Sequence, residues 1–388
     1  MDISYIINEL GEDREQYFNA IAPPIMQTSN FAFKSVAAMR SAFADEYSTY
    51  LYSRGKNPTV DILCKKLAAL DGADDCLVFN SGAAAIFAAV LANVKQGDHI
   101  ISVHEPYSWA KKMFTEILPK FGVSTTFVDG TATKHFEQAI QPNTTVIYLE
   151  SPNSWDFVLQ DLTAVAQLAK AHNIITICDN SYCTPLYQQP IACGIDIALQ
   201  SATKYISGHS DTVAGVLSSN THMIARIFKS EYNNIGSGIQ PFNAWLLLRG
   251  LRTLPMRLQQ ISTSTKTMVA FLKNHPLVDG VYFPLDVDFN QYTLAQQQMK
   301  GAAGLITFTI KANSVKAIET FCESLQHIMM AVSWGGYESL IIPKCAGLPV
   351  DSFDAQNPLH RSLRLYVGLE EVDYLIKDLS KAFATLQP

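Results

Sequence analysis

The feature that most constrains the fold is a regular alternation of short β-branched runs with helical patterns between residues 75 and 219. Amphipathic segments at residues 107–121 and 162–171 separate several of these runs. The candidate strands are residues 76–79, 99–103, 124–128, 145–149, 174–178, 197–201 and 212–217. Such alternation predicts an α/β fold with a mostly parallel seven-stranded sheet covered by helices on both faces. Ligands of such sheets bind beyond the carboxyl ends of the strands.

The length of 388 residues is more than one hydrophobic core usually supports. A long helical pattern at residues 242–272, interrupted by Gly250 and Pro255, indicates a hinge into a second domain. Residues 1–55 contain many aromatic side chains but little periodicity, which is typical of an arm. Beyond the hinge, apolar runs at 305–310 and 363–368 alternate with helical patterns at 315–327 and up to Phe383. We therefore expect an arm at 1–55, a large domain at 56–245 and a smaller C-terminal α/β domain at 246–388.

Composition narrows the environment and the partners of the chain. The net charge of -6 leaves no basic surface for nucleic acid. The longest apolar stretches, such as residues 83–94, are too short to span a bilayer, and no secretion leader opens the chain. The seven cysteines form no CxxC pair, which favours reduced thiols over disulfides or a zinc site. We expect a cytoplasmic protein without nucleic-acid or membrane partners and without a metal.

A lysine lies among small hydroxyl residues in the stretch Ser201-Ala202-Thr203-Lys204, downstream of a candidate strand that ends near Asp179. Pyridoxal phosphate needs an amine for its aldehyde, hydroxyl and amide donors for its phosphate, and an anion for its ring nitrogen. The pattern therefore predicts a Schiff base between Lys204 and this cofactor, with Asp179 at the ring nitrogen. Alternatively, Lys204 is an exposed loop lysine and Asp179 caps a helix that begins at Asn180.

The stretch Phe79-Asn80-Ser81-Gly82-Ala83-Ala84 leads from a candidate strand through small residues into an alanine-rich helical pattern. Small side chains allow a phosphate to approach the free amides of a helix N-terminus, where the helix dipole favours negative charge. Close packing of the helix on the sheet is the alternative explanation. Because Ser201 and Thr203 supply further donors, we favour the phosphate site.

These motifs together resemble the Cys/Met-metabolism family of pyridoxal phosphate enzymes, which has the aspartate aminotransferase fold, fold type I. The resemblance runs from residues 11–14 and 22–25 to the final helical pattern. Residues 196–208 are similar to the cofactor-lysine signature of the family. Within the family, residues 150–154 and 332–340 look most like the bacterial cystathionine β-lyases.

The resemblance implies a set of cofactor contacts. The backbone of Gly82 and Ala83 and the hydroxyls of Ser201 and Thr203 would bind the phosphate. Tyr52 and Arg54 match a pair that reaches the phosphate of a neighbouring subunit, so the family predicts a homo-oligomer, a dimer with shared sites or a tetramer. A surface ion pair of Arg54 is the alternative, worth under ~1 kcal/mol.

The resemblance also implies residues that act on the substrate. Tyr107 matches the tyrosine that stacks on the cofactor ring and helps to move a proton, although a plain rim residue is the alternative. Arg364 would bind the α-carboxylate with its planar fork, with Ser333 and Trp334 nearby in the substrate pocket. A structural ion pair of Arg364 with Glu338 or Glu370 is the other possibility.

The implied reaction is β-elimination on cystathionine or a related sulfur amino acid, which gives pyruvate, ammonia and a thiol. Two alternatives stay open, namely a γ-specific lyase or transferase and a cofactor-binding regulatory protein without turnover. Val332 departs from the tyrosine of close β-lyases and the glutamate of many γ-lyases. We expect His209 to support the lysine loop, and His104 and His360 to have surface or packing roles.

Overall fold

The computed structural model describes residues 1–386, which form two compact units. The first unit contains Met1–Asn153, Val158–Ser207 and Asp211–Arg252. The second contains Ser154–Phe157, Gly208–Ser210 and the described chain from Thr253 onward. Two short segments that are early in the sequence therefore belong to the C-terminal unit.

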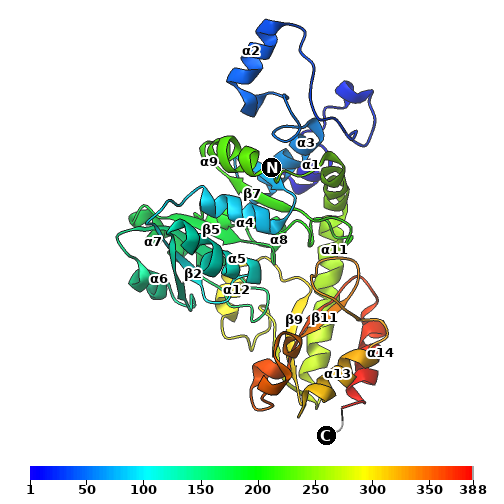
Figure 1. Ribbon diagram of the computed structural model, residues 1–388. Helices are drawn as coiled ribbons and strands as arrows, with labels where there is room; N and C mark the ends of the chain where they lie inside the picture. The colour runs from blue at the N-terminus through cyan, green and yellow to red at the C-terminus, as the bar shows by residue number, and fades with distance from the viewer. Residues whose placement is uncertain (387–388) are drawn as a thin grey trace. The chain divides into compact units, whose positions relative to one another are not determined.

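The first unit is built on a seven-stranded sheet with the order β1-β7-β6-β5-β4-β2-β3 (Figure 1). All neighbours are parallel except β7, which is antiparallel to β1 and to β6. The predicted seven-stranded, mostly parallel sheet is confirmed. The strands are β1 (Asp75–Phe79), β2 (His99–Val103), β3 (Ser124–Val128), β4 (Thr144–Glu150), β5 (Ile175–Asp179), β6 (Ile197–Gln200) and β7 (Gly215–Ser219).

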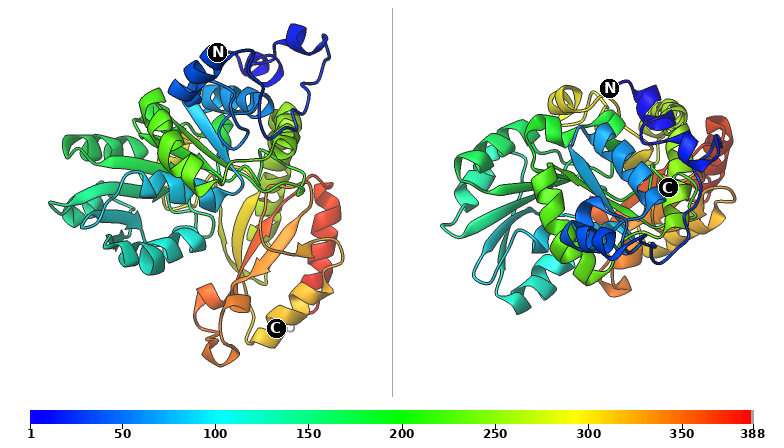
Figure 2. Two further views of the ribbon diagram at one scale, coloured as in Figure 1. Left: turned by 45° about the horizontal axis from the view of Figure 1, so that its top comes forward. Right: turned by 90° about the horizontal axis from the view of Figure 1, so that it is seen from above.

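Helices cover both faces of this sheet, as the turned views also show (Figure 2). Consecutive strand residues alternate between two apolar clusters, so that Ile100 and Ile101 contribute to different ones. The alternation explains why both faces need a helical layer. The helices are α3 (Pro58–Asp71), α4 (Gly82–Leu91), α5 (Ser108–Lys112), α6 (Thr133–Ala139), α7 (Leu162–Ala171), α8 (Thr184–Tyr187), α9 (Thr221–Ile227) and α10 (Asn233–Ile235), with π-helical turns at Met113–Ile117 and Phe228–Tyr232.

The long helix α11 (Pro241–Lys273) is continuous, so the predicted interruption at Gly250 and Pro255 is wrong. Gly250 has a packing reason, because a Cβ there would lie 2.4 Å from the carbonyl oxygens of Ile206 and Ser207. Pro255 lies inside the helix, whose remaining hydrogen bonds continue past it. Close backbone contact, rather than a break, accounts for the glycine.

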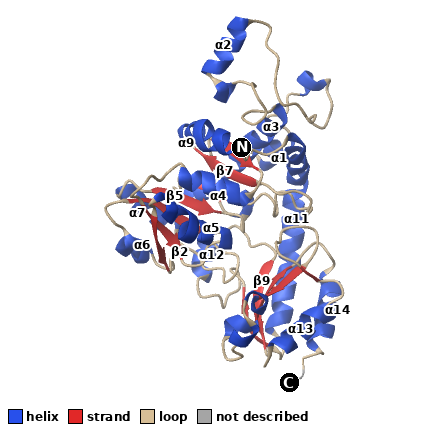
Figure 3. Ribbon diagram, in the orientation of Figure 1, coloured by secondary structure: helices blue, strands red, loops and turns tan. Residues whose placement is uncertain are grey.

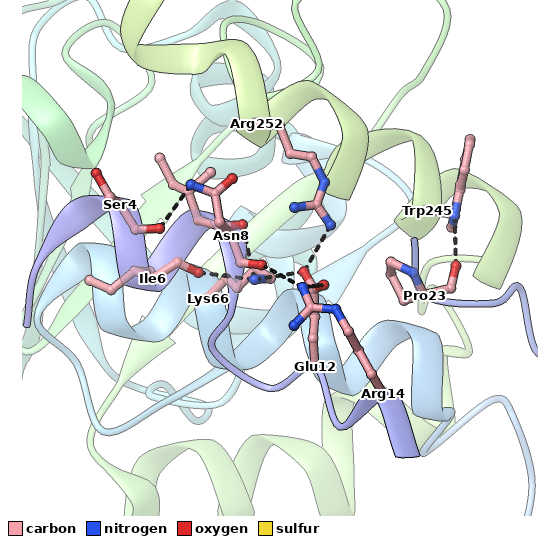
Figure 4. Close-up of polar contacts among 10 residues, drawn as sticks. Ser4, Ile6, Asn8, Glu12, Arg14, Pro23, Lys66, Trp245 and Arg252 are labelled. Atoms are coloured by element: carbon pink, nitrogen blue, oxygen red, sulfur yellow. Dashed lines mark hydrogen bonds and ion pairs between the residues drawn. The ribbon is translucent and has the colours of Figure 1, made fainter. Parts of the chain in front are cut away.

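The first 55 residues contain short helices, namely α1 (Ile3–Asn8), α2 (Val36–Ala44) and 3₁₀ turns at Arg14–Tyr17 and Glu46–Ser48. A buried carboxylate, Glu12, anchors this segment (Figure 4). Its Oε1 lies 3.0 Å from the Lys66 Nζ and 2.9 Å from an Arg252 nitrogen, while its Oε2 lies 3.1 Å from Arg14. Lys66 also donates to the carbonyls that end α1, so one amine and one acid join α1, α3 and α11.

The second unit contains a five-stranded sheet with the order β10-β11-β12-β9-β8 (Figure 3). This is the predicted smaller α/β region, with strands that the sequence missed. Its strands are β8 (Val278–Tyr282), β9 (Leu305–Ile310), β10 (Met329–Met330), β11 (Leu340–Pro343) and β12 (Ser362–Tyr366), and its helices are α12 (Tyr292–Gln298), α13 (Val315–Ser324) and α14 (Val372–Phe383). Short 3₁₀ turns complete the chain at Leu118–Phe121, Pro190–Cys193, Lys344–Gly347, Val350–Ser352 and Pro358–Arg361.

Two findings bear on environment. Within residues 1–386, no helix is both long and apolar enough to cross a membrane. All seven cysteines are free thiols, and six of them are buried. Burial raises the pKa of most of these thiols, for example of Cys183 and Cys322, which keeps them protonated and unreactive near neutral pH.

Candidate active site

Three side chains gather at the carboxyl ends of β2, β4 and β5. Asp179 ends β5 and lies directly opposite Glu150, the last residue of β4. The Glu150 carboxylate accepts the backbone N–H of Tyr107 at 2.6 Å and so holds the start of α5 beyond the end of β2. The parallel register therefore places Asp179 beside Glu150, the residue that holds the backbone of Tyr107.

Asp179 is an almost fully buried carboxylate, with 7% of its surface exposed. Burial raises its pKa, while the Ser181 hydrogen bond, donated by the backbone N–H at 2.9 Å, and the Lys204 charge pull the pKa down. No helix begins at Asn180, and α8 starts only at Thr184, so the alternative role of Asp179 as a helix cap does not apply. An added cation beside this acid would keep it ionised.

Lys204 lies in a turn between β6 and β7 and is half-buried. Its backbone N–H donates to the carbonyl of Ser201 at 3.1 Å, and the backbone N–H of Ser207 donates to the carbonyl of Ala202 at 2.9 Å. Because the Lys204 charge acts on the pKa of Asp179, the amine and the acid belong to one electrostatic site. The half-buried position of Lys204 differs from that of a fully exposed loop lysine, and its role as the cofactor lysine stays a prediction.

The N-terminus of α4 supplies free amide groups. Ser81 caps the helix, since its hydroxyl accepts the N–H of Ala84 at 3.1 Å and its carbonyl accepts the N–H of Ala85 at 3.2 Å. The amides of Gly82 and Ala83 make no hydrogen bond within the described residues, as expected for the first helical positions. They are therefore available to an anion.

Gly82 also brings the helix start against Ser201. A Cβ at Gly82 would lie 3.1 Å from the Ser201 Cβ and 3.2 Å from its hydroxyl. Ser201 is held in place by its own N–H, which donates to the Ser181 hydroxyl at 2.7 Å. Glycine at position 82 thus allows the start of α4 to lie close to Ser201. This close packing is compatible with phosphate binding at the same motif.

Thr203 is engaged within the lysine turn. Its hydroxyl accepts the N–H of Ala214 at 3.0 Å and donates to the carbonyl of the same residue at 3.2 Å. The hydroxyl would have to turn away from Ala214 to donate to a phosphate. Its role as a phosphate donor stays a prediction.

These features of the first unit fit pyridoxal phosphate. The charge of Lys204 acts on the buried acid of Asp179, and a buried carboxylate is the kind of group that pairs with a protonated ring nitrogen. The free amides of Gly82 and Ala83 lie against Ser201, where an anion gains both the helix dipole and donors.

Tyr107 has an accessible ring, with 41% of its surface exposed. Burial and the charges of Asp179 and Glu150 raise the pKa of its phenol, so the hydroxyl is protonated at neutral pH. A protonated phenol can donate a hydrogen bond or a proton to a developing negative charge.

Tyr52 and Arg54 lie together on the surface of the first unit. The Arg54 guanidinium carbon is 5.4 Å from the centre of the Tyr52 ring, and both side chains are exposed. Within residues 1–386, no carboxylate lies at ion-pair distance from Arg54, so the alternative of an intrachain surface ion pair is not supported.

The second unit carries the predicted substrate residues. Arg364 is the central residue of β12 and donates to the carbonyl of Ser154 at 3.0 Å. Ser333 has a left-handed backbone with φ 84°, and Trp334 beside it is buried. Glu338 and Glu370 are the alternative ion-pair partners of Arg364, and both accept hydrogen bonds from serines. Glu338 accepts from Ser210 at 2.5 Å, and Glu370 accepts from Ser339 at 2.8 Å.

Some functional candidates escaped sequence reasoning. Glu150 was part of a recognised motif, but its hydrogen bond to the Tyr107 amide depends on the pairing of β4 with β2. Trp155 and Lys344 form a cation–π contact of 4.4 Å across nearly two hundred residues of sequence. A tryptophan just after a strand of the wound sheet was the one available signal for Trp155.

Two of the histidines, His104 and His360, have local contacts. His104 is exposed near Glu105, and the His360 Nδ1 accepts the N–H of Asp354 at 3.0 Å. Among the described residues, no group of three or more His, Cys, Asp or Glu could hold a metal ion.

The chain is similar to known proteins over nearly its whole length. The family model for Cys/Met metabolism PLP-dependent enzymes matches residues 5–384. An L-methionine gamma-lyase of Treponema denticola is 35% identical over 95% of this chain and 94% of its own length. A cystathionine beta-lyase of Bacillus subtilis is 34% identical over 95% of this chain and 93% of its own.

A solved structure gives the same result for the fold. The crystal structure of metB from Corynebacterium glutamicum has a TM-score of 0.91 and 30% identity, and the match covers 100% of this chain and 99% of that one. The predicted fold type and the pyridoxal phosphate cofactor are confirmed. The chain belongs to the family of Cys/Met metabolism PLP-dependent enzymes.

Proposed function

We propose that this enzyme is a carbon–sulfur lyase that eliminates a thiol from the β-carbon of cystathionine or a related sulfur amino acid. Pyruvate and ammonia are the other products. The observation that carries the proposal is the electrostatic pairing of Lys204 with the buried Asp179, beside the free amides of α4. The named relatives include lyases of both β and γ specificity, which supports carbon–sulfur cleavage in general.

The cofactor-holding residues follow from this site. Lys204 provides the amine for the aldehyde, and Asp179 provides the anion for the ring nitrogen. The remaining residues bind the phosphate or the ring face, and they are Gly82, Ala83, Ser201, Thr203, Tyr107 and, from a neighbouring subunit, Tyr52 and Arg54. When bound, pyridoxal phosphate withdraws electrons from the substrate α-carbon.

The protein's own residues supply the proton transfers. Lys204 takes the proton from the substrate α-carbon as a general base, since its amine belongs to the same electrostatic site as Asp179. Tyr107 keeps its proton at neutral pH and can donate it towards the leaving sulfur. The Lys204 amine is therefore the general base, and the Tyr107 phenol is the general acid.

Arg364 orients the substrate by binding its α-carboxylate with a planar, two-pronged grip. Its position in the middle of β12 and its hydrogen bond to Ser154 restrict the side chain before any substrate arrives. Ser333 and Trp334 complete the substrate-binding set. The similarity of residues 332–340 to bacterial β-lyases is what favours β- over γ-elimination.

A γ-specific reaction is the second candidate. Two L-methionine gamma-lyases, from Treponema denticola and Porphyromonas gingivalis, are each 35% identical to this chain, against 34% for the cystathionine beta-lyase. Such a small difference in identity does not separate the two chemistries. The α-keto acid product does separate them, because β-elimination leaves three carbons and γ-elimination leaves four.

We further propose a cytoplasmic homo-oligomer, a dimer with shared sites or a tetramer. Free thiols support a reducing environment. Within residues 1–55, large apolar side chains such as Phe18 (99% exposed), Ile21 (81%) and Val36 (74%) face solvent, which suits burial against a second copy.

The deciding experiment incubates the purified holoenzyme with cystathionine and, separately, with methionine, and identifies the keto acid. We expect pyruvate from cystathionine and little product from methionine. Release of 2-oxobutanoate from both compounds would replace β- with γ-elimination. No keto acid from any sulfur amino acid would instead support a cofactor-binding protein without turnover.

A further inference from the structure

Three neighbouring strands of the second unit place side chains in one row across its sheet. Arg364 on β12 lies directly opposite Thr307 on β9 and Ile342 on β11. Directly opposite residues project from the same face, and side chains along a strand alternate between faces. Lys344 is two residues beyond Ile342 and begins the 3₁₀ turn that follows β11.

The segment Ser154–Trp155 lies over this row. The Thr307 hydroxyl donates to the Trp155 carbonyl at 2.6 Å, and Arg364 donates to the Ser154 carbonyl at 3.0 Å. These two bonds fix the backbone of the segment above β9 and β12. The indole ring then receives two cations, with the Lys344 Nζ at 4.4 Å and the Arg364 guanidinium carbon at 5.4 Å from its centre.

Two positively charged side chains lie against one ring. The distance between the Lys344 and Arg364 charges cannot exceed the sum of their distances to the centre of the Trp155 ring. All three side chains are half-buried. Within residues 1–386, no carboxylate lies at ion-pair distance from Lys344. The electron-rich face of the indole lowers the repulsion, but an anion would lower it further.

The role proposed for Arg364 gives this surface a chemical meaning. Arg364 takes one carboxylate of the substrate, which leaves Lys344 as a second cation on the same aromatic platform. A lysine ammonium binds anions as a point charge and tolerates variable geometry. Such a group is suited to the distal part of a substrate, whose position varies with the group attached to sulfur.

We propose that Lys344 is a specificity-determining residue that binds a second acidic group, carried on the sulfur substituent of the substrate. The enzyme then favours thioether amino acids with an anionic sulfur substituent over neutral ones such as methionine. The proposal rests on the assignment of Arg364 to the α-carboxylate. Cystathionine satisfies it, because the distal half of that molecule carries its own carboxylate.

The kinetic test compares a matched pair of substrates. S-(2-carboxyethyl)-L-cysteine carries a distal carboxylate, whereas S-(2-carbamoylethyl)-L-cysteine replaces it with a neutral amide of the same shape. We expect wild-type kcat/KM to favour the acid by about tenfold or more, and Lys344→Gln to reduce that ratio to about one. Lys344→Arg should retain most of the preference, because it retains the charge.

A matched control comes from the same unit. Lys316 on α13 is exposed and pairs only with Glu319, so Lys316→Gln removes an equal charge without touching Trp155. This control should keep the wild-type ratio of acid to amide. If Lys344→Gln also keeps it, the inference is overturned. The homocysteine analogues of both compounds are assayed in parallel, so that a γ-specific enzyme is tested in the same way.

A binding measurement separates this inference from the proposed reaction. Pimelate has the chain length of the acid substrate but no amine or sulfur, and heptanoate is its monocarboxylate counterpart. Binding to the holoenzyme is followed by tryptophan fluorescence, with Trp155→Phe identifying the signal of Trp155. If no thioether yields a keto acid, the lyase proposal fails, yet tighter binding of pimelate that is lost in Lys344→Gln still supports the inference. Equal binding of pimelate by wild type and Lys344→Gln contradicts it.

Discussion

The candidate sites of the two units are formed by different kinds of structural features. In the first unit, the site consists of the ends of parallel strands, the turn that bears Lys204 and the free amides of α4. In the second unit, Arg364 on β12 and Lys344 in the turn after β11 lie against Trp155, which belongs to a segment from far earlier in the sequence. The proposed cofactor site thus rests on local backbone features, and the proposed substrate site rests on long-range side-chain contacts.

This contrast predicts that substitutions in the two units will affect different measurements. Changes at Asp179 should alter the affinity and spectrum of the bound cofactor. Changes at Arg364 or Lys344 should alter substrate capture and leave the bound cofactor as it is. A substitution in the second unit that releases pyridoxal phosphate would break the distinction.

The largest effect is expected for Asp179→Asn. The substitution removes a buried negative charge that we propose to pair with the ring nitrogen, and the loss of one partner of a buried ion pair costs roughly 3–5 kcal/mol. Turnover should fall on the order of 100-fold or more, and the pH dependence of the cofactor absorbance should shift. Titration of the absorbance and steady-state kinetics measure both effects. A variant with wild-type absorbance and kcat would show that Asp179 does not contact the ring.

Arg364→Ala should follow, with kcat/KM lower by about 100-fold, because a charged hydrogen-bonding group no longer binds the substrate carboxylate. We expect most of this change in KM. Cofactor content, measured by absorbance after gel filtration, should match wild type. Arg364→Lys is the informative companion, since it keeps the charge but loses the two-pronged geometry. Unchanged kcat/KM in Arg364→Ala would remove the basis of the Lys344 proposal as well.

A separate effect, on the pH dependence of stability, is expected from a second buried acid of the first unit, Asp71, which can be compared with Asp179. Asp71 ends α3 and accepts hydrogen bonds from Gln200 and Ser218, each at 2.6 Å, and burial raises its pKa to about 7. Unlike Asp179, it has no cation among the causes that act on its pKa. Because the folded-state pKa lies above the unfolded-state value, this group stabilises the fold least at high pH. Its contribution is fully present below about pH 4 and is lost as the pH rises through 7.

Asp71→Asn should therefore be more stable than wild type at pH 8, by on the order of 4 kcal/mol, with no comparable gain at pH 4. Urea unfolding at several pH values gives the difference directly, because the titration of all other groups cancels between the two proteins. A gain that is the same at both pH values would mean that Asp71 does not change its protonation between them.

Much of the first unit could be predicted because its signals are local. The strands at 99–103 and 124–128 have the predicted bounds, since β-branched runs are flanked there by turn residues. The start of β7 was placed too early, at 212 rather than Gly215, because an apolar run does not show where pairing begins. The break predicted in α11 was wrong, because tertiary packing overrides the low helix propensity of glycine and proline.

The second unit was less accessible to sequence reasoning. β8 is only partly buried and contains Gly280, and β10 has two exposed residues, so neither gives a strong strand pattern. Lys66, Trp155 and Lys344 have polar or aromatic partners that lie far away in the sequence. Nothing in their local sequence indicates those partners, whereas the surroundings of Lys204 carry a recognisable motif.

The central claim is that Lys204 is the residue that carries the cofactor. The most direct measurement reduces the wild-type holoenzyme with borohydride, digests it and locates the pyridoxyl group by mass spectrometry. We predict a single modified peptide, with the label on Lys204, and no labelled peptide from Lys204→Ala. A label on another lysine, or a labelled Lys204→Ala protein, would contradict the account.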